Sequence, residues 1–227
     1  MALGLALVVG GGCTDRKSDQ TPNGSTLHQL LTGESPEEDR SRWDRIYSQS
    51  GYVYGTDPSP YLVARLQGIA PGKALDIAMG EGRNGVFLAK KGFSIEGVDL
   101  SEVALKKAKR LARENGVTMV TTVADLTQYK VREKTYSLIL MIDYFQRSLI
   151  PQIRKGLRPD GVFLLEGSCV RGEGSQGSTF IQDDGAQPLQ CGEAATLLKD
   201  FSILHEEVGS DKSGPILRVT ASLKRGN

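Results

Sequence analysis

The stretch from Lys73 to Asn84 constrains the fold more than any other part of the chain. Residues Ala74 to Met79 are apolar apart from Asp76 and predict a short buried strand that ends near an acid. Gly80 and Gly82 then predict a turn that opens a helix. This order is typical of the first unit of an open α/β sheet, where a nucleotide-like ligand binds beyond the carboxyl end of the strand, against backbone free of side chains. We therefore predict a cofactor site at this turn.

Two cofactors are compatible with the turn. Gly80, Gly82 and Gly85 satisfy the dinucleotide pattern G-x-G-x-x-G, and Asp99 follows Gly80 by 99 − 80 = 19 residues. However, a dinucleotide places an anionic pyrophosphate here, and the carboxylate of Asp76 opposes an anion at a helix N-terminus. S-adenosylmethionine instead carries an ammonium and a sulfonium cation, which an acid at the end of a strand suits. The residues therefore favour S-adenosylmethionine over NAD.

The remainder of the chain alternates between predicted strands and helices. This alternation favours a Rossmann-like, doubly wound α/β fold: a mainly parallel seven-stranded sheet with an antiparallel C-terminal strand and helices on both faces. We predict strands at 74–78, 94–99, 118–123, 137–142, 161–166, 202–208 and 216–223. Helices are predicted at 37–49, 84–91, 102–115, 149–156 and 193–200, and one further helix is predicted to end at Leu66.

Composition excludes several classes of function. A length of 227 residues allows one large domain, and a formal net charge of +1 gives no basic surface for nucleic acid. Cys13, Cys169 and Cys191 stand far apart without a C-x-x-C pair. They exclude a zinc ribbon or a disulfide framework, so we expect free thiols and no metal site.

The first 36 residues differ in composition from residues 37–227, which we expect to form the folded domain. The apolar run from Ala2 to Val9 is followed by three glycines and Cys13, which resembles a bacterial lipoprotein processing site. No Lys or Arg precedes this run, and it is shorter than the ~18 residues of a spanning helix. Two localisations stay open: a cytoplasmic protein with a disordered leader, or a membrane-anchored lipoprotein through a lipidated Cys13.

Four motifs together resemble the class I S-adenosylmethionine-dependent methyltransferases, and specifically the tellurite-resistance and thiopurine-methyltransferase-like group. The resemblance runs from about Arg42 to Leu223. Its motifs are Trp43-Asp44 with Tyr47 and Tyr54-Gly55, Leu75-Asp76 through Gly80-Glu81-Gly82-Arg83-Asn84, Gly97-Val98-Asp99-Leu100-Ser101, and Leu157-Arg158-Pro159-Asp160-Gly161. Two residues depart from the usual pattern: Ala78 stands in place of glycine, and Met79 where cysteine is common.

The resemblance implies roles for particular residues. Asp76 would meet the ammonium of S-adenosylmethionine, and Asp99 would accept hydrogen bonds from both ribose hydroxyls. A carboxylate at Asp125 would accept from the adenine amine, while Ser101 is better placed than Asp99 to cap the following helix. The implied cofactor-binding residues are Asp76, Ala78, Met79, Gly80, Gly82, Asn84, Asp99, Leu100, Ala124, Asp125 and Leu126.

The acceptor side follows the fourth strand, at Asp143 and Tyr144. The Asn/Asp-Pro-Pro-Tyr/Phe motif of many methyltransferases that act on DNA or protein amines is absent, which favours a small-molecule acceptor such as a thiol or chalcogen. Such soft nucleophiles require alignment and desolvation more than a base, so we expect no essential acid–base residue.

Further residues near the acceptor are predicted from both ends of the domain. Trp43 and Tyr54 would close from the N-terminal side, and Arg147 either binds an anionic substrate or pairs with a neighbouring acid. Two alternatives from other classes remain: an NAD-dependent oxidoreductase, and a non-catalytic nucleotide-binding protein tethered to a membrane.

Overall fold

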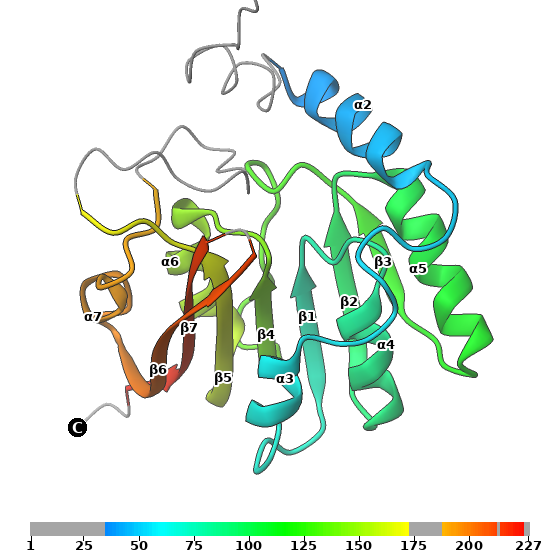
Figure 1. Ribbon diagram of the computed structural model, residues 1–227. Helices are drawn as coiled ribbons and strands as arrows, with labels where there is room; N and C mark the ends of the chain where they lie inside the picture. The colour runs from blue at the N-terminus through cyan, green and yellow to red at the C-terminus, as the bar shows by residue number, and fades with distance from the viewer. Residues whose placement is uncertain (1–34, 173–187, 213, 225–227) are drawn as a thin grey trace, which may run out of the picture.

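A computed structural model of the chain describes residues 35–172, 188–212 and 214–224, and the predictions for residues 1–34 of the leader lie outside these ranges. Its centre is one seven-stranded sheet in the order β3-β2-β1-β4-β5-β7-β6, flanked by helices (Figure 1). Only β7 runs antiparallel to its neighbours, β5 and β6, and the other pairs are parallel. The predicted fold class is confirmed.

Each predicted strand is present, with some bounds shifted. The strands are β1 (Lys73–Ile77), β2 (Ser94–Asp99), β3 (Val120–Val123), β4 (Tyr136–Ile142), β5 (Leu157–Ser168), β6 (Phe201–Asp211) and β7 (Gly214–Leu223). The C-terminal strands are longer than predicted because β5, β6 and β7 extend beyond the buried part of the sheet as paired backbone. Hydrophobic runs locate only the buried portion of a strand.

The predicted helices are also present. They are α2 (Pro36–Tyr47), α3 (Pro60–Arg65), α4 (Arg83–Lys90), α5 (Glu102–Glu114), a 3-10 turn η1 (Arg147–Leu149), α6 (Ile150–Gly156) and α7 (Ala194–Leu197). Helix α7 is much shorter than the predicted 193–200. Ser35 caps α2 by accepting from the backbone N–H of Glu38, so the helix begins just inside the expected leader.

Two cores cover the two faces of the sheet. Every residue of β4 is buried, as expected for a central parallel strand that is covered on both sides. On one face Ile139 packs with Ile153 of α6 and Leu198 near α7. On the other face Leu138 packs with Leu62 of α3 and Leu88 of α4. The carboxyl ends of β1, β2 and β4 are thereby held side by side.

The expectation of free thiols is wrong for two cysteines, because Cys169 and Cys191 form a disulfide. Cys169 follows β5, and Cys191 precedes α7, at a sequence separation of 22. The pairing follows from the backbone: Val170 and Gln190 form a parallel bridge, which brings the two cysteines together. Sequence spacing gave no sign of this approach. In the described part of the chain, no helix has the length and apolar character needed to cross a membrane.

Candidate cofactor and acceptor site

A pocket lies at the carboxyl ends of β1, β2 and β4, where the sequence predicts the cofactor. Its walls come from α2, the connection between α2 and α3, the glycine turn after β1, and the segments that follow β2, β3 and β4. The lining residues are Trp43, Tyr47, Tyr54, Gly55, Ala78, Met79, Gly80, Glu81, Arg83, Asn84, Asp99, Leu100, Leu126, Ile142, Asp143 and Tyr144.

Asp76, near the end of β1, has a buried carboxylate and does not itself line the pocket. The backbone N–H of Gly85 donates to the carboxylate, but its Oδ2 atom is buried with no hydrogen-bond partner. Burial raises the pKa of Asp76 to about 7, because removal from water disfavours the charged form more than nearby Arg83 favours it. A buried oxygen without a donor is costly unless a ligand supplies one. An ammonium group is the kind of donor that it lacks.

Asp99 ends β2 and organises the glycine turn. Its Oδ2 accepts from the backbone N–H of Gly80 at 2.8 Å, and its Oδ1 from that of Ser101 at 2.9 Å. Burial raises the pKa of Asp99 to about 6, although these backbone hydrogen bonds act in the opposite direction. Each carboxylate oxygen keeps a second lone pair, so Asp99 can still accept from hydroxyl groups of a ligand. As predicted, Ser101 caps α5 by accepting from Ala104.

The glycine turn needs its glycines for two different reasons. Gly80 has φ +54°, and a Cβ there would lie 3.0 Å from the hydroxyl of Tyr47 in the pocket wall. Gly82 does not line the pocket, since a Cβ there would meet Ala108 of α5 at 2.8 Å. Gly82 therefore permits close helix packing. Ala78 also has a positive φ, +53°, which explains why glycine would suit this position.

Aromatic side chains from the N-terminal segment form the outer wall. Trp43 stacks on Tyr47 with ring centroids 5.6 Å apart, and Tyr54 meets Tyr47 edge-on at 6.1 Å. Tyr47 is buried and Tyr54 is 40% exposed. Trp43 and Tyr47 of α2 thus both line the pocket and pack against each other.

Helix α2 is fixed over the site by Asp44. Its Oδ1 accepts from the hydroxyl of Ser101 at 2.5 Å and from the backbone N–H of Val103 at 3.2 Å. Both donors lie at the N-terminus of α5, where a carboxylate also interacts favourably with the helix dipole. This contact holds Trp43 beside the pocket.

Arg83 and Asp143 form an ion pair at the acceptor side of the pocket, with Nη2 and Oδ2 2.5 Å apart. Asp143 has φ +57°, a conformation that is uncommon for a residue with a side chain and often found at functional sites. Burial raises the pKa of Asp143, while Arg83 counters this shift. Tyr144 follows in the pocket wall, with its hydroxyl 2.6 Å from Oε1 of Gln146.

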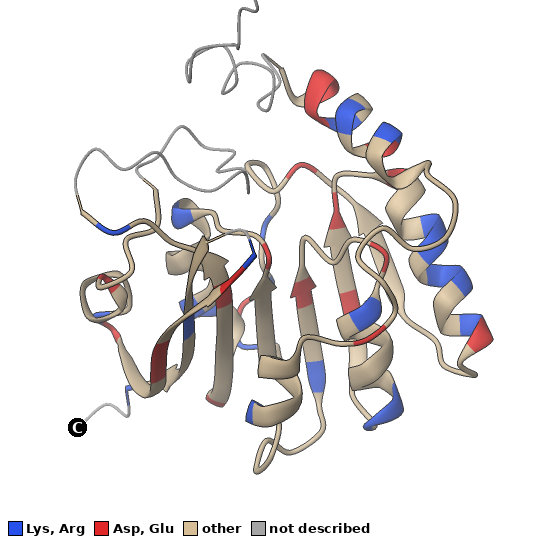
Figure 2. Ribbon diagram, in the orientation of Figure 1, with Lys and Arg blue, Asp and Glu red and all other residues tan. Residues whose placement is uncertain are grey.

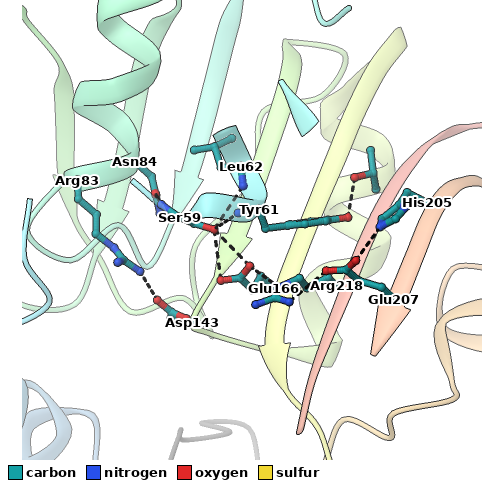
Figure 3. A network of polar contacts seen from close by, with 11 residues as sticks. Ser59, Tyr61, Leu62, Arg83, Asn84, Asp143, Glu166, His205, Glu207 and Arg218 are labelled. Carbon is teal, nitrogen blue, oxygen red and sulfur yellow. Dashed lines mark hydrogen bonds and ion pairs between the residues drawn. The ribbon is translucent and has the colours of Figure 1, made fainter. Parts of the chain in front are cut away.

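A polar network adjoins the acceptor side of the pocket (Figure 3). The hydroxyl of Ser59 donates to the carboxylate of Glu166 on β5, and the backbone N–H of Ser59 donates to Oδ1 of Asn84. Arg218 on β7 donates to the same carboxylate at 2.9 Å. The carbonyl oxygen of Glu166 accepts from the backbone N–H of Asp143. The network therefore ties α3, α4 and the end of β4 together.

Several predicted site residues lie away from the pocket wall. Of the predicted adenine-site residues, Leu126 lines the pocket, whereas Ala124 does not and Asp125 accepts from the backbone N–H of Thr127 in a local turn. Arg147 does not line the pocket and pairs with Glu193 at 2.8 Å, the second of its two predicted fates.

Other pocket residues were not predicted as site residues. Arg83 and Glu81 belong to the glycine turn, and Gly55 and Ile142 adjoin predicted residues. Gly55, Glu81 and Arg83 lie within the motifs of the family resemblance, which was the signal that could have identified them.

Comparison with known proteins agrees with this arrangement. Residues 74–161 match a family described as "Methyltransferase domain". The 2-heptyl-1-hydroxyquinolin-4(1H)-one methyltransferase of Mycobacteroides abscessus is 31% identical over 101 residues, 44% of each chain. A ubiquinone biosynthesis O-methyltransferase of Actinobacillus pleuropneumoniae is 26% identical over 115 residues, 46% of this chain and 49% of that one. The chain thus spans about half the length of these curated relatives.

Solved structures share the fold. The 1,6-didemethyltoxoflavin-N1-methyltransferase of Burkholderia thailandensis, solved with S-adenosylhomocysteine, has a TM-score of 0.63 and 21% identity, over 84% of this chain and 91% of that one. TehB of Haemophilus influenzae has a TM-score of 0.62 and 16% identity, over 82% and 68%.

Proposed function

We propose that the protein is an S-adenosylmethionine-dependent methyltransferase of small molecules, a proposal supported by the match of residues 74–161 to a methyltransferase domain and by the order of the sheet. The observation that carries the proposal is the unpartnered Oδ2 of buried Asp76 beside the glycine turn. A cationic donor group would satisfy that oxygen, whereas the phosphates of a dinucleotide would not. This difference argues against the oxidoreductase alternative.

The residues of the pocket fit the proposed cofactor. Asp76 would hold the ammonium group, Asp99 the ribose hydroxyls, and Leu100 and Leu126 the apolar faces of the base. When bound, S-adenosylmethionine supplies an electrophilic methyl group on a sulfonium. The aromatic rings of Trp43 and Tyr54 would favour that cation by about 1 kcal/mol each and exclude water from its surroundings.

For the acceptor, we propose a soft nucleophile such as a thiol or chalcogen. Alignment in a desolvated pocket supplies most of the rate for such groups, and no base has to be placed at the reacting atom. The aromatic wall of Trp43, Tyr54 and Tyr144 provides that desolvation. The ion pair between Arg83 and Asp143 leaves neither group dedicated to proton transfer.

A hydroxylated aromatic ring is the second candidate acceptor, because four aromatic side chains line the pocket and a planar ring would stack among them. Asp143 would then accept the hydroxyl proton, a role that its raised pKa suits. The names of two relatives, a hydroxyquinolone methyltransferase and a ubiquinone biosynthesis O-methyltransferase, point to the same class of acceptor.

Labelled S-adenosylmethionine and a panel of small thiols, selenols and phenols test both acceptors. Label transfer to thiols that survives Asp143→Asn supports the soft nucleophile. Transfer to phenols that is lost in Asp143→Asn supports the aromatic acceptor. A folded protein that binds the donor and labels no member of either class would contradict both, and would favour a non-catalytic binding protein.

For localisation, we propose that the enzyme acts in the cytoplasm, where the methyl donor is made, and that residues 1–36 are dispensable for donor binding. The disulfide between Cys169 and Cys191 instead favours the lipoprotein alternative, because disulfides rarely persist under the reducing conditions of the cytoplasm. Fractionation of the native host tests this proposal. Full-length protein in the membrane fraction that is released by Cys13→Ala would instead establish the lipoprotein alternative.

A further inference from the structure

The connection between α2 and α3 carries a short segment, Gln49 to Tyr54, which we call the strap. It passes α5 and approaches the glycine turn (Figure 1). Its last residue, Tyr54, lines the pocket beside Tyr47. The strap has no helical or strand hydrogen bonding of its own, so its position depends on what fastens it.

One fastening comes from the glycine turn itself. The backbone N–H groups of Val53 and Tyr54 both point to Oε2 of Glu81, at 2.7 and 3.4 Å. Glu81 stands between Gly80 and Gly82 and is buried. The turn that would receive the methyl donor therefore also holds the end of the strap that carries Tyr54.

A second fastening comes from Lys107 on α5, in addition to the hydrogen bonds of the Tyr52 hydroxyl with Arg110 and Glu114 of the same helix. Its ammonium donates to the carbonyl oxygens of Gln49 and Gly51 at 2.8 and 2.7 Å, and to Oε1 of Glu81 at 2.9 Å. An ammonium has three donors, and all three are used here. Lys107 thus joins the start of the strap to the side chain that holds its end.

The neighbouring lysine shows what an ordinary ion pair on the same helix looks like. The Lys107 and Glu81 side chains are 13% and 3% exposed, whereas those of Lys106 and Glu102 are 68% and 61% exposed. Figure 2 shows positive charges along α5, the helix that carries both lysines. A buried ion pair gains little net stability, because desolvation of the two charges offsets their attraction. Its value here is the geometry that it imposes on the strap.

We propose that Lys107 is a positioning residue, which acts through Glu81 to hold the strap and Tyr54 across the pocket and so slows release of the methyl donor. The inference rests on the proposed function. Lys107 does not itself line the pocket, so its removal leaves the donor contacts of Asp76 and Asp99 in place. The expected effect is therefore on dissociation more than on association.

Trp43 offers a direct readout, because it is the only tryptophan in the chain and lines the pocket. Stopped-flow fluorescence with S-adenosylhomocysteine would give the dissociation rate. For Lys107→Met we expect this rate to rise about tenfold, because the strap loses the two hydrogen bonds that the ammonium donates to its carbonyl oxygens. Lys106→Met, the matched control, should release the ligand at the wild-type rate. Lys107→Arg keeps the charge and should restore much of the slow release.

Hydrogen exchange of the Val53 and Tyr54 amides separates failure of this inference from failure of the proposed function. In ligand-free protein, Lys107→Met should increase exchange in the strap and leave β4 protected, which a general loss of stability would not do. If wild-type protein binds no S-adenosylhomocysteine, the proposed function fails and strap exchange alone decides the positioning role. Wild-type release together with wild-type strap exchange in Lys107→Met would overturn the inference.

Discussion

Buried carboxylates near the two ends of the sheet differ in how they are neutralised. Toward the amino ends of the strands, Glu96 accepts from Arg132 and Tyr136 and pairs with Lys73. Burial alone would raise the pKa of Glu96, but these partners outweigh it and the pKa is lowered. At the carboxyl ends, Asp76 has one unpartnered oxygen and a raised pKa. The protein itself supplies the counter-charges for Glu96. One oxygen of Asp76 has no partner in the protein, and a bound ligand could supply one.

Gly80→Val is expected to have the largest effect on this pocket. A side chain at φ +54°, 3.0 Å from the Tyr47 hydroxyl, fills the space that backbone leaves for the donor. Affinity for S-adenosylmethionine should fall by more than about 100-fold in calorimetry, or ~3 kcal/mol. Gly116→Val is the control, since Gly116 has φ +68° with open space around it. It should strain the backbone equally and leave affinity unchanged; equal affinity losses in both variants would remove the turn from the site.

Asp99→Ala should rank second, with a loss of donor affinity of about 2 kcal/mol as hydrogen bonds to the ribose disappear. Part of this loss comes from the turn, because the Gly80 N–H also loses its acceptor. Asp99→Asn keeps one acceptor oxygen and should lose less. Wild-type affinity in a folded Asp99→Ala protein would show that β2 does not end at the ribose.

Paired substitutions at Asp76 and Glu96 test the contrast itself. At pH 8, Asp76→Asn should raise the free energy of unfolding by about 1 kcal/mol, because a desolvated charge is removed. Glu96→Gln should lower the free energy of unfolding by about 1 kcal/mol, since the charged partners Lys73 and Arg132 are partly exposed and solvent screens their ion pairs with Glu96. Chemical denaturation measures both. If both substitutions changed the free energy of unfolding in the same direction, the distinction between Asp76 and Glu96 would be wrong.

The pH dependence of stability and of donor affinity follows from the raised pKa of Asp76. The pKa of Asp76 is about 7 in the folded protein and 3.8 ordinarily, so the folded state keeps a proton that the unfolded chain has lost. Its contribution therefore lowers stability as pH rises from about 4 to about 7. A bound ammonium favours the ionised acid, so donor affinity should increase over the same range as binding releases a proton. The increase should be largely absent in Asp76→Asn.

Ala78→Gly should have the smallest effect. It relieves a positive φ at a residue with a Cβ but adds chain entropy to the unfolded state, so the two contributions nearly cancel. We expect a melting temperature within about 2 °C of wild type. Donor affinity should not change. A large gain in affinity would show that the alanine methyl obstructs the pocket.

Features set by local sequence could be predicted, whereas contacts between residues distant in sequence could not. The sheet, the glycine turn and Asp99 follow from period, spacing and local chemistry, which act over a few residues. The fastening of the strap by Lys107, the identity of Glu193 as the partner of Arg147 and the disulfide between Cys169 and Cys191 could not be predicted. Each joins residues that are distant in sequence, and their approach depends on how finished elements pack.

One calorimetric experiment tests the central claim most directly: titration of the wild-type protein with S-adenosylmethionine and, separately, with NAD at pH 8. The account predicts saturable binding of S-adenosylmethionine, accompanied by a change in Trp43 fluorescence, and no binding of NAD. Saturable binding of NAD without binding of S-adenosylmethionine would contradict the assignment of Asp76 to a cation and return the glycine turn to a dinucleotide.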